Sequence, residues 1–168
     1  TVGIGAETEY LLIYSKSEDW VPNRLERTDE MDAKYKNPDN DWNPWISVIF
    51  SAPGASSHQG MVYAIQHPFT GELLYPTQSA HWKLGQQEVL RVMNQWCPYE
   101  LRDINDSKKR AEVCGIPESE VREGVCAIML KEPLEKSREL AQAVLERGQW
   151  PKLYFTKNGE GGIRRKSY

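Results

Sequence analysis

The sequence lacks the features that would place it in a membrane or in the secretory pathway. No stretch of its 168 residues approaches the roughly 18 consecutive apolar residues that a membrane-spanning helix needs. The segment that follows Thr1 has no basic region of the kind that opens a secretory signal. Because the first residue is not Met, we expect the chain to begin inside a longer protein.

Cysteine is scarce and widely spaced. Cys97, Cys114 and Cys126 are odd in number and form no Cys-x-x-Cys pair, which argues against a disulfide framework and a paired-cysteine zinc site. We therefore expect free thiols in the reducing environment of the cytoplasm.

Catalytic motifs are missing as well. The sequence has no His-Glu-x-x-His pair, no Gly-x-Ser-x-Gly elbow and no Walker sequence. The glycines from 159 to 162 fit a hairpin turn better than a phosphate site. His58, His67 and His81 lie in separate contexts, for which a structural role is the simpler interpretation. We expect no catalytic residue, cofactor or metal within this chain.

What is present is the composition of an ordinary globular domain. The chain is 39% hydrophobic and 27% charged, and it is long enough to bury a core. Its net charge is −3, whereas a free-standing nucleic-acid-binding domain is usually basic. The charge is uneven, because residues 18–41 are mainly acidic and residues 150–168 carry five basic residues against one acid.

Short apolar runs separated by turn residues predict strands and hairpins. The predicted strands and hairpin arms are Glu7–Ser15, Trp45–Phe50, Met61–Gln66 with Glu72–Tyr75, and Lys152–Thr156 with Ile163–Tyr168. The first hairpin turns at a Pro-Phe-Thr-Gly sequence and the second at a loop that contains Asn-Gly. Residues 51–60 are small, polar and rich in glycine, and predict a loop.

Caps and apolar spacing predict about three helices. They run from Thr28 to Lys36, from Gln86 to Trp96, and from Pro133 to Gly148. Residues 99–131 are charged and weakly periodic, and we expect local helix there. The fold class is therefore α+β, with mainly antiparallel hairpins.

Two polar segments are candidates for contact with DNA, but the residue types of each also allow a purely structural role. Residues 35–41 concentrate amides, which can bind adenine edges, but they equally suit a turn that hydrogen-bonds to itself. That turn is the favoured interpretation. The basic run 163–166 can follow a phosphate backbone, or it can protect an edge strand by charge.

The order of these segments resembles one family of proteins. The residues that carry the resemblance are the strand 8–16, Asn23-Arg24-Leu25, Arg27, Glu30-Met31-Asp32, Tyr35-Lys36-Asn37-Pro38-Asp39-Asn40-Asp41, Tyr63, Ile65, Pro68, Gly71, Tyr75-Pro76, Trp82, Gly159, Arg164, Lys166 and Tyr168. In this order they resemble the modification subunits of type III restriction systems, which are adenine-specific DNA methyltransferases. The run 35–41 is the most specific part, and residues 99–131 show no match.

The resemblance breaks after Asp41. Members of the family usually continue with Pro-Arg-Gly before a Trp, whereas this chain continues with Trp42-Asn43-Pro44-Trp45. An expected Arg is absent, so its contact cannot be carried over and the recognised DNA sequence is not implied.

The resemblance implies that the chain is an internal fragment with the target recognition region. Residues 1–16 would end the catalytic-domain sheet, and residues 17–168 would form the target recognition domain, with a variable insert near 97–132. The chain contains neither the Asp-Pro-Pro-Tyr-type sequence that holds a flipped adenine nor the Phe-x-Gly-x-Gly-type sequence for S-adenosylmethionine. The parent protein is thus implied to be the methyltransferase, and the fragment alone is expected to be inactive.

The implied partners are double-stranded DNA, a second modification subunit and the restriction subunit. A recognition domain embedded in a larger dimer does not have to be basic overall. The expected DNA contacts are Arg24, Arg27, Lys34, Lys152, Lys157, Arg164, Arg165 and Lys166 for the backbone, with Asn37, Asn40 and Asn43 in base or turn roles. One alternative is a protein-interaction module that contacts the restriction or helicase subunit through residues 18–41 and 99–131. Another is a small free-standing enzyme of unknown type.

Overall fold

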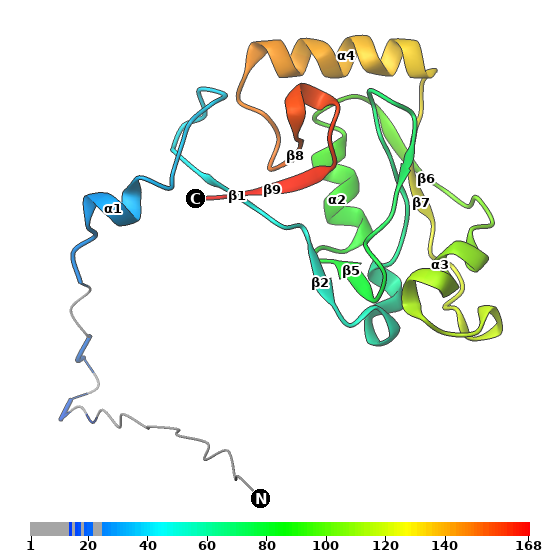
Figure 1. Ribbon diagram of the computed structural model, residues 1–168, viewed down its shortest axis with the longest axis horizontal. Coiled ribbons are helices and arrows are strands. Elements are labelled where there is room, and N and C mark those ends of the chain that lie inside the picture. Colours follow the sequence, from blue (N-terminus) through cyan, green and yellow to red (C-terminus); the bar gives the residue numbers. More distant parts are fainter. Residues whose placement is uncertain (1–13, 15, 18, 22–24) are drawn as a thin grey trace, which may run out of the picture. The chain divides into compact units, whose positions relative to one another are not determined.

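The computed structural model describes Tyr14, Lys16–Ser17, Asp19–Val21 and Leu25–Tyr168 (Figure 1). The chain divides into two units, residues 1–32 and residues 33–168. The strand expected at Glu7–Ser15, and with it the expected end of a catalytic-domain sheet, lies outside the described residues except for positions 14 and 16.

The first unit contains the helix α1 (Asp29–Asp32). Thr28 caps it as expected, because its hydroxyl accepts a hydrogen bond from the Met31 N–H at 3.3 Å. The helix expected to reach Lys36 ends at Asp32. None of its residues is buried, so no apolar face holds further turns in place.

The second unit holds three small sheets. Their strand orders are β1-β9-β8, β2-β5 and β4-β3-β7-β6. Neighbouring strands are antiparallel except β3 and β7, which are parallel. The strands are β1 (Ile46–Val48), β2 (Ser51–Pro53), β3 (Ile65–Gln66), β4 (Leu73–Leu74), β5 (Ala80–Trp82), β6 (Tyr99–Arg102), β7 (Ala127–Leu130), β8 (Leu153–Phe155) and β9 (Ile163–Ser167).

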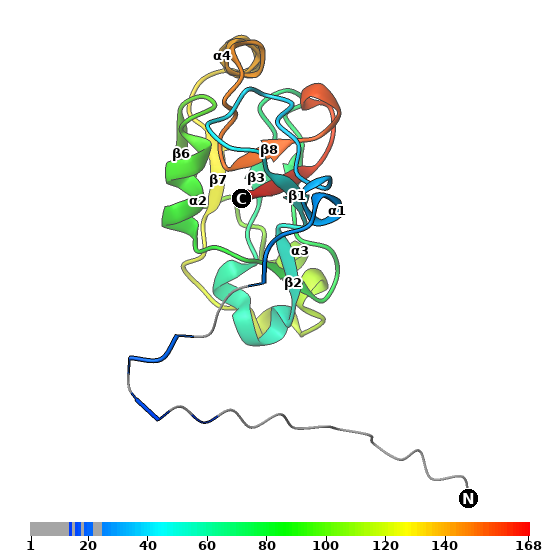
Figure 2. The same ribbon diagram turned by 90° about the vertical axis from the view of Figure 1, so that its left-hand side faces the viewer.

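Three α-helices and three 3₁₀ turns accompany these sheets in the 33–168 unit. They are α2 (Gln86–Met93), α3 (Ser107–Cys114), α4 (Leu134–Arg147), η1 (Ala55–Met61), η2 (Glu118–Glu120) and η3 (Lys157–Gly159). Helix α2 lies between the first and third sheets and contacts both β8 and β6 (Figure 1). Figure 2 shows α4 end-on at the margin of the unit, where it contacts η3. The unit has the α+β fold that the sequence predicts.

Both predicted hairpins are present. The β3–β4 hairpin forms around the Pro-Phe-Thr-Gly turn, with Gly71 at a positive φ of 81°. The β8–β9 hairpin forms around the Asn-Gly loop. The predicted helices at 86–96 and 133–148 are confirmed as α2 and α4, although α2 ends three residues early.

Other expectations change in the structure. Residues 51–60, expected as a loop, contain β2 and most of η1. Strand β9 is the central strand of its sheet, so the suggestion of a charge-protected edge strand is wrong. Residues 99–131 contain β6, α3, η2 and β7, and β7 pairs on both sides in the third sheet.

Two buried tryptophans donate hydrogen bonds to backbone carbonyls in the core of the second unit. Trp96 is 2% exposed and lies among the buried side chains between the sheets. Its indole N–H donates to the Leu153 carbonyl at 2.8 Å, and the Trp82 indole donates to the Tyr63 carbonyl at 2.9 Å. Each buried donor thus has an acceptor, as burial of a polar group requires. No helix among the described residues has the length and apolarity needed to cross a bilayer.

His67 links the two hairpins in its neutral form. Its Nδ1 accepts hydrogen bonds from the backbone N–H groups of Phe69 and Thr70, at 3.1 and 3.2 Å. Its Nε2 then carries the proton and donates to the Gly161 carbonyl at 3.1 Å. Burial lowers the pKa of His67 below its ordinary 6.5, against smaller opposing effects from Gly161 and Glu72.

This arrangement predicts a loss of stability in mild acid. Below pH 6.5 the unfolded chain binds a proton at His67 that the folded chain resists, so the free energy of unfolding falls until the folded pKa is passed. Replacing His67 with Gln should remove this part of the pH dependence, so the variant should lose less stability in mild acid than the wild type. Urea unfolding between pH 7.5 and about 5 tests the difference. An identical pH dependence of the free energy of unfolding for the wild type and the His67→Gln variant would contradict it.

Gly148 follows the last residue of α4 and packs against the segment that contains Asp39. Its backbone has φ 80° and ψ −167°, a region that essentially only glycine occupies. A Cβ atom at this position would lie 2.5 Å from the Asp39 carbonyl oxygen. Both the backbone conformation and the close contact therefore require glycine.

Replacing Gly148 with Ala should destabilise the protein by about 3 kcal/mol or more, because strain and a steric clash add. Gly124 is the matched control, since its φ is also positive, at 70°, but nothing lies within 4 Å of its virtual Cβ. Replacing Gly124 with Ala should cost only about 1–2 kcal/mol, the cost of a left-handed backbone without a clash. If thermal unfolding shows that the two variants lose equal stability, the contact with Asp39 is unimportant.

Candidate nucleic-acid interface

Most of the run 35–41 lies in a closed loop formed by residues 36–45, which we call the 36–45 loop. The Lys36 N–H donates to the Trp45 carbonyl at 3.0 Å, and the Trp45 N–H donates back at 2.9 Å. Inside the loop the Asn37 amide donates to the Asp41 carbonyl at 2.7 Å and accepts from the Asp41 N–H at 2.6 Å. Asn40 takes the left-handed conformation, with φ 52°. The self-bonded turn favoured by the residue types is confirmed, and the side chain of Asn37 belongs to it.

Asp39 points inward and anchors the 36–45 loop to the rest of the unit. Its side chain is fully buried. The carboxylate accepts hydrogen bonds from the Trp45 indole at 2.9 Å, from the Trp150 backbone N–H at 2.8 Å, and from the Lys166 ammonium. Its carbonyl accepts from the Gln149 N–H at 2.6 Å. A buried carboxylate needs such donors, because it has lost the solvation of water.

Asp41 shares the same ammonium group. The Lys166 Nζ lies 2.6 Å from an Asp41 carboxylate oxygen, and the Tyr168 hydroxyl donates to the same oxygen. Burial acts to raise the pKa of Asp41, but hydrogen bonds from Lys166, Tyr168 and the Trp42 N–H outweigh it and hold that pKa below 3.8. The carboxylate therefore stays charged at neutral pH.

Lys166 takes a different place from the one the sequence predicts for it. Its side chain is 0% exposed, it pairs with both aspartates, and its Nζ lies 5.1 Å from the centroid of the Trp45 ring. An ammonium in this position does not face a phosphate backbone. We therefore remove Lys166 from the predicted DNA contacts and assign it a structural role.

The exposed surface of this region is basic, amide-rich and aromatic. Lys34, Lys36, Asn40 and Asn43 are exposed, and the indole of Trp42 is 75% exposed. Of the acidic residues in 33–45, Asp39 is buried and Asp41 is nearly so. Residues 33–45 thus present two lysines and two amides to solvent, whereas Asp29, Glu30 and Asp32 in the first unit are exposed.

Strand β9 adds two arginines that lie on opposite faces of the strand. Arg164 and Arg165 are both half-buried. Within the part of the chain that the structure describes, neither guanidinium takes part in a hydrogen bond or an ion pair, and the Arg165 Nε is buried without an acceptor. An unpaired buried donor of this kind is uncommon in a folded protein.

The remaining predicted contacts are scattered. Lys152 is exposed just before β8, and Lys157 is exposed in η3. Arg27 belongs to the first unit, where it pairs with Asp32 at 2.5 Å. Arg24 lies outside the described residues. The structure therefore brings together Asn37 and Lys166 around the two aspartates, and places Arg164 and Arg165 on the same strand as Lys166.

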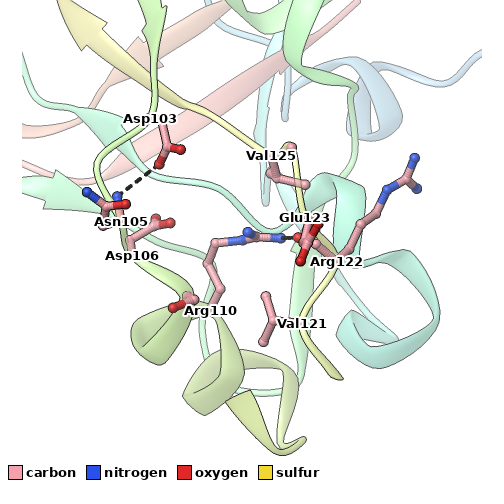
Figure 3. Close-up of a pocket in the computed structure, with 10 residues that line it drawn as sticks. Asp103, Asn105, Asp106, Arg110, Val121, Arg122, Glu123 and Val125 are labelled. Carbon is pink, nitrogen blue, oxygen red and sulfur yellow. Dashed lines mark hydrogen bonds between the residues drawn. The ribbon is translucent and has the colours of Figure 1, made fainter. Parts of the chain in front are cut away.

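A surface cavity of about 380 Å³ lies in residues 103–125, where no resemblance was seen. Figure 3 shows the Arg110 side chain reaching from α3 to the segment that holds Arg122. Arg110 is 4% exposed and donates to the carbonyls of Val62 and Arg122, at 3.0 and 2.8 Å. The cavity is also lined by the carboxylates Asp103, Asp106 and Glu123. Its chemistry is unsuited to phosphate, because three acidic residues line it and the Arg110 guanidinium already donates to two carbonyls.

A second cavity of about 230 Å³ has mainly apolar walls. It is lined by Phe50, Leu74, Trp82 and Ile163, and Arg164 also borders it. This places the Arg164 side chain beside a hollow rather than on a flat surface.

Cys97 is a weak nucleophile, and the described residues form no group suited to a metal ion. Burial raises the pKa of the Cys97 thiol to about 11, against smaller effects from Tyr99 and Ser137, so its reactive thiolate is scarce. Across the part of the chain with described positions, no three His, Cys, Asp or Glu side chains are placed to hold a metal ion.

The structural role of Lys166 predicts a large loss of stability when its charge is removed. Replacing Lys166 with Met leaves two inward-facing carboxylates without their shared cation, which should cost about 3–5 kcal/mol. Lys152 is the matched control, because it is exposed, and Lys152→Met should change the free energy of unfolding by less than about 0.5 kcal/mol. Urea unfolding at pH 7 measures both. If Lys166→Met lowers the free energy of unfolding as little as Lys152→Met does, the structural role of Lys166 is contradicted.

The chain was compared with models of protein families, with curated proteins and with solved structures, and none of the three comparisons finds a match.

Proposed function

We propose that this chain is the DNA target recognition region of a site-specific adenine-N6 methyltransferase of a type III restriction-modification system. In this role it binds duplex DNA and positions the target adenine. The order of sequence segments supports the assignment, and so does the surface chemistry of the 36–45 loop.

One observation carries the proposal. The two acids of the most specific run face inward and bind Lys166, so the lysines, amides and Trp42 are left to face solvent. Cations that neutralise phosphates provide most of the affinity for DNA, while amides can read base edges. The exposed side chains of residues 33–45 are thus more basic than the chain's net charge of −3 suggests.

The proposed contacts follow from exposure and pairing. Arg164 and Arg165 have no internal partner among the described residues and are the leading candidates for phosphates. Lys34, Lys36, Lys152 and Lys157 supplement them as exposed cations, and Asn40 and Asn43 are candidates for base edges. Arg24 and Arg27 stay in the proposal as contacts from the first unit.

Catalysis belongs elsewhere in this proposal. The chain has neither the Asp-Pro-Pro-Tyr-type nor the Phe-x-Gly-x-Gly-type sequence, so S-adenosylmethionine and methyl transfer are assigned to polypeptide outside these residues. A second modification subunit and the restriction subunit complete the proposed assembly, which we place in the cytoplasm.

The cavity at 103–125 favours a second candidate, a module that contacts the restriction or helicase subunit. Its three carboxylates suit a basic protein segment better than DNA. If the full-length protein gives no salt-sensitive shift of duplex DNA, and Asp103→Asn with Glu123→Gln abolishes binding of that subunit, the second candidate replaces the first.

The arginines of β9 provide the direct test of DNA binding. Replacing Arg164 and Arg165 with Ala in the full-length protein should weaken duplex binding by about tenfold or more. The slope of log affinity against log salt should become shallower by roughly 2, because two phosphate contacts are lost.

The control for this test replaces Lys109 and Lys136 with Ala. Both lysines are exposed and already paired with glutamates on or beside helices α3 and α4, so affinity and salt dependence should not change. Fluorescence anisotropy with labelled duplex measures all variants. Unaltered binding by the double arginine variant, with the fold intact, would refute the assignment.

A further inference from the structure

We propose that Trp42 is a stacking site for a DNA base that has left the base-pair stack. This inference rests on the proposed function and adds a ligand to it. No feature of the sequence resemblance assigns a role to Trp42, because the resemblance breaks at this residue.

The indole of Trp42 is both exposed and fixed in place. It is 75% exposed, and the Tyr168 ring stacks on it, with the centroids 4.9 Å apart and the ring planes 28° from parallel. The Trp42 backbone N–H donates to the Asp41 carboxylate at 2.8 Å, and the Tyr168 hydroxyl donates to the same carboxylate. Backbone and ring are thus held by one group, which Lys166 in turn anchors.

A fixed aromatic ring is a favourable platform for a ligand. Covering a large apolar side chain with a second surface removes it from water and is therefore favourable. Little conformational freedom is lost on binding, because the Tyr168 stack already restrains the ring. Tyr168 covers one face, so the remaining face is the part available to a planar partner.

The surroundings of Trp42 select the chemistry of that partner. Its exposed neighbours in sequence include the amides Asn40 and Asn43 and the cations Lys34 and Lys36. A hydrophobic protein interface would instead present several apolar side chains together. A nucleotide combines a planar π-face with a phosphate, and it therefore uses both the indole and the cations.

The base must be displaced from the duplex to reach the indole face. In a stacked duplex the grooves show only the edges of the bases. The flat face becomes accessible when a base is flipped out or a step is kinked, as recognition of a target adenine by a methyltransferase requires.

Two DNA probes separate stacking from phosphate contact. One is a fully paired duplex of mixed sequence, and the other is the same duplex with a few unpaired thymines at its centre. The full-length wild-type protein should bind the second probe at least about fivefold more tightly, the lower limit expected for one aromatic–base stack. Trp42→Ala should abolish this preference, and Trp42→Phe should retain part of it.

Trp20→Ala is the matched control, because Trp20 is also exposed, at 50%, but belongs to the first unit. It should keep the wild-type preference. Trp42→Ala should also leave the salt dependence unchanged, since the indole carries no charge. Thermal unfolding confirms that each variant is folded.

The outcomes distinguish the two proposals. If the wild type binds both probes equally, or if Trp42→Ala keeps the preference, the stacking inference is overturned while DNA binding stands. If the wild type binds neither probe in a salt-dependent manner, the proposed function fails and the inference fails with it.

Discussion

The ammonium group of Lys166 sits between the carboxylates of Asp39 and Asp41, and this ion cluster joins three distant parts of the chain. It connects the 36–45 loop to the central strand β9, while Asp39 also binds the segment that follows α4. Buried ion pairs contribute little net stability compared with a well-packed apolar core, but losing one partner is costly. The cluster therefore acts by fixing the conformation of the 36–45 loop. It also turns both acids away from the surface, which gives that surface its basic character.

The local elements of the fold could be predicted because their causes are local. The apolar positions Val89, Val92 and Met93 have helical spacing and are all buried in α2. The hairpin turns are set by Gly71 and by the Asn-Gly pair. The pairing of β1 with β9 and of β3 with β7 could not be predicted, because it depends on packing between segments far apart in sequence. In residues 99–131, the charged side chains of Glu100 and Arg102 concealed β6, a strand that pairs along its whole length with β7.

The candidate interface was predicted only in part, and for a related reason. Arg164, Arg165 and Lys166 look alike in sequence, yet Lys166 is buried and the two arginines remain unpaired among the described residues. What separates them is the position of Asp39, which lies 127 residues away along the chain. The turn-forming role of Asn37 followed from residue type, because Asn favours local hydrogen bonds. No feature of residue type marked Trp42 as a candidate contact, since the exposure of its indole depends on where Tyr168 packs.

The long separation between Asp39 and Lys166 also affects how the protein is made. Chains are synthesised at about 5–20 residues per second, so Lys166, which lies 127 positions after Asp39, is added roughly 6–25 s later. During this interval Asp39 and Asp41 have no cation to pair with, and β1 has no β9 beside it. The hairpin of β3 and β4 and the helix α2 can form earlier, because their partners are near in sequence. The proposed DNA-facing loop is therefore among the last parts of residues 33–168 to acquire its structure.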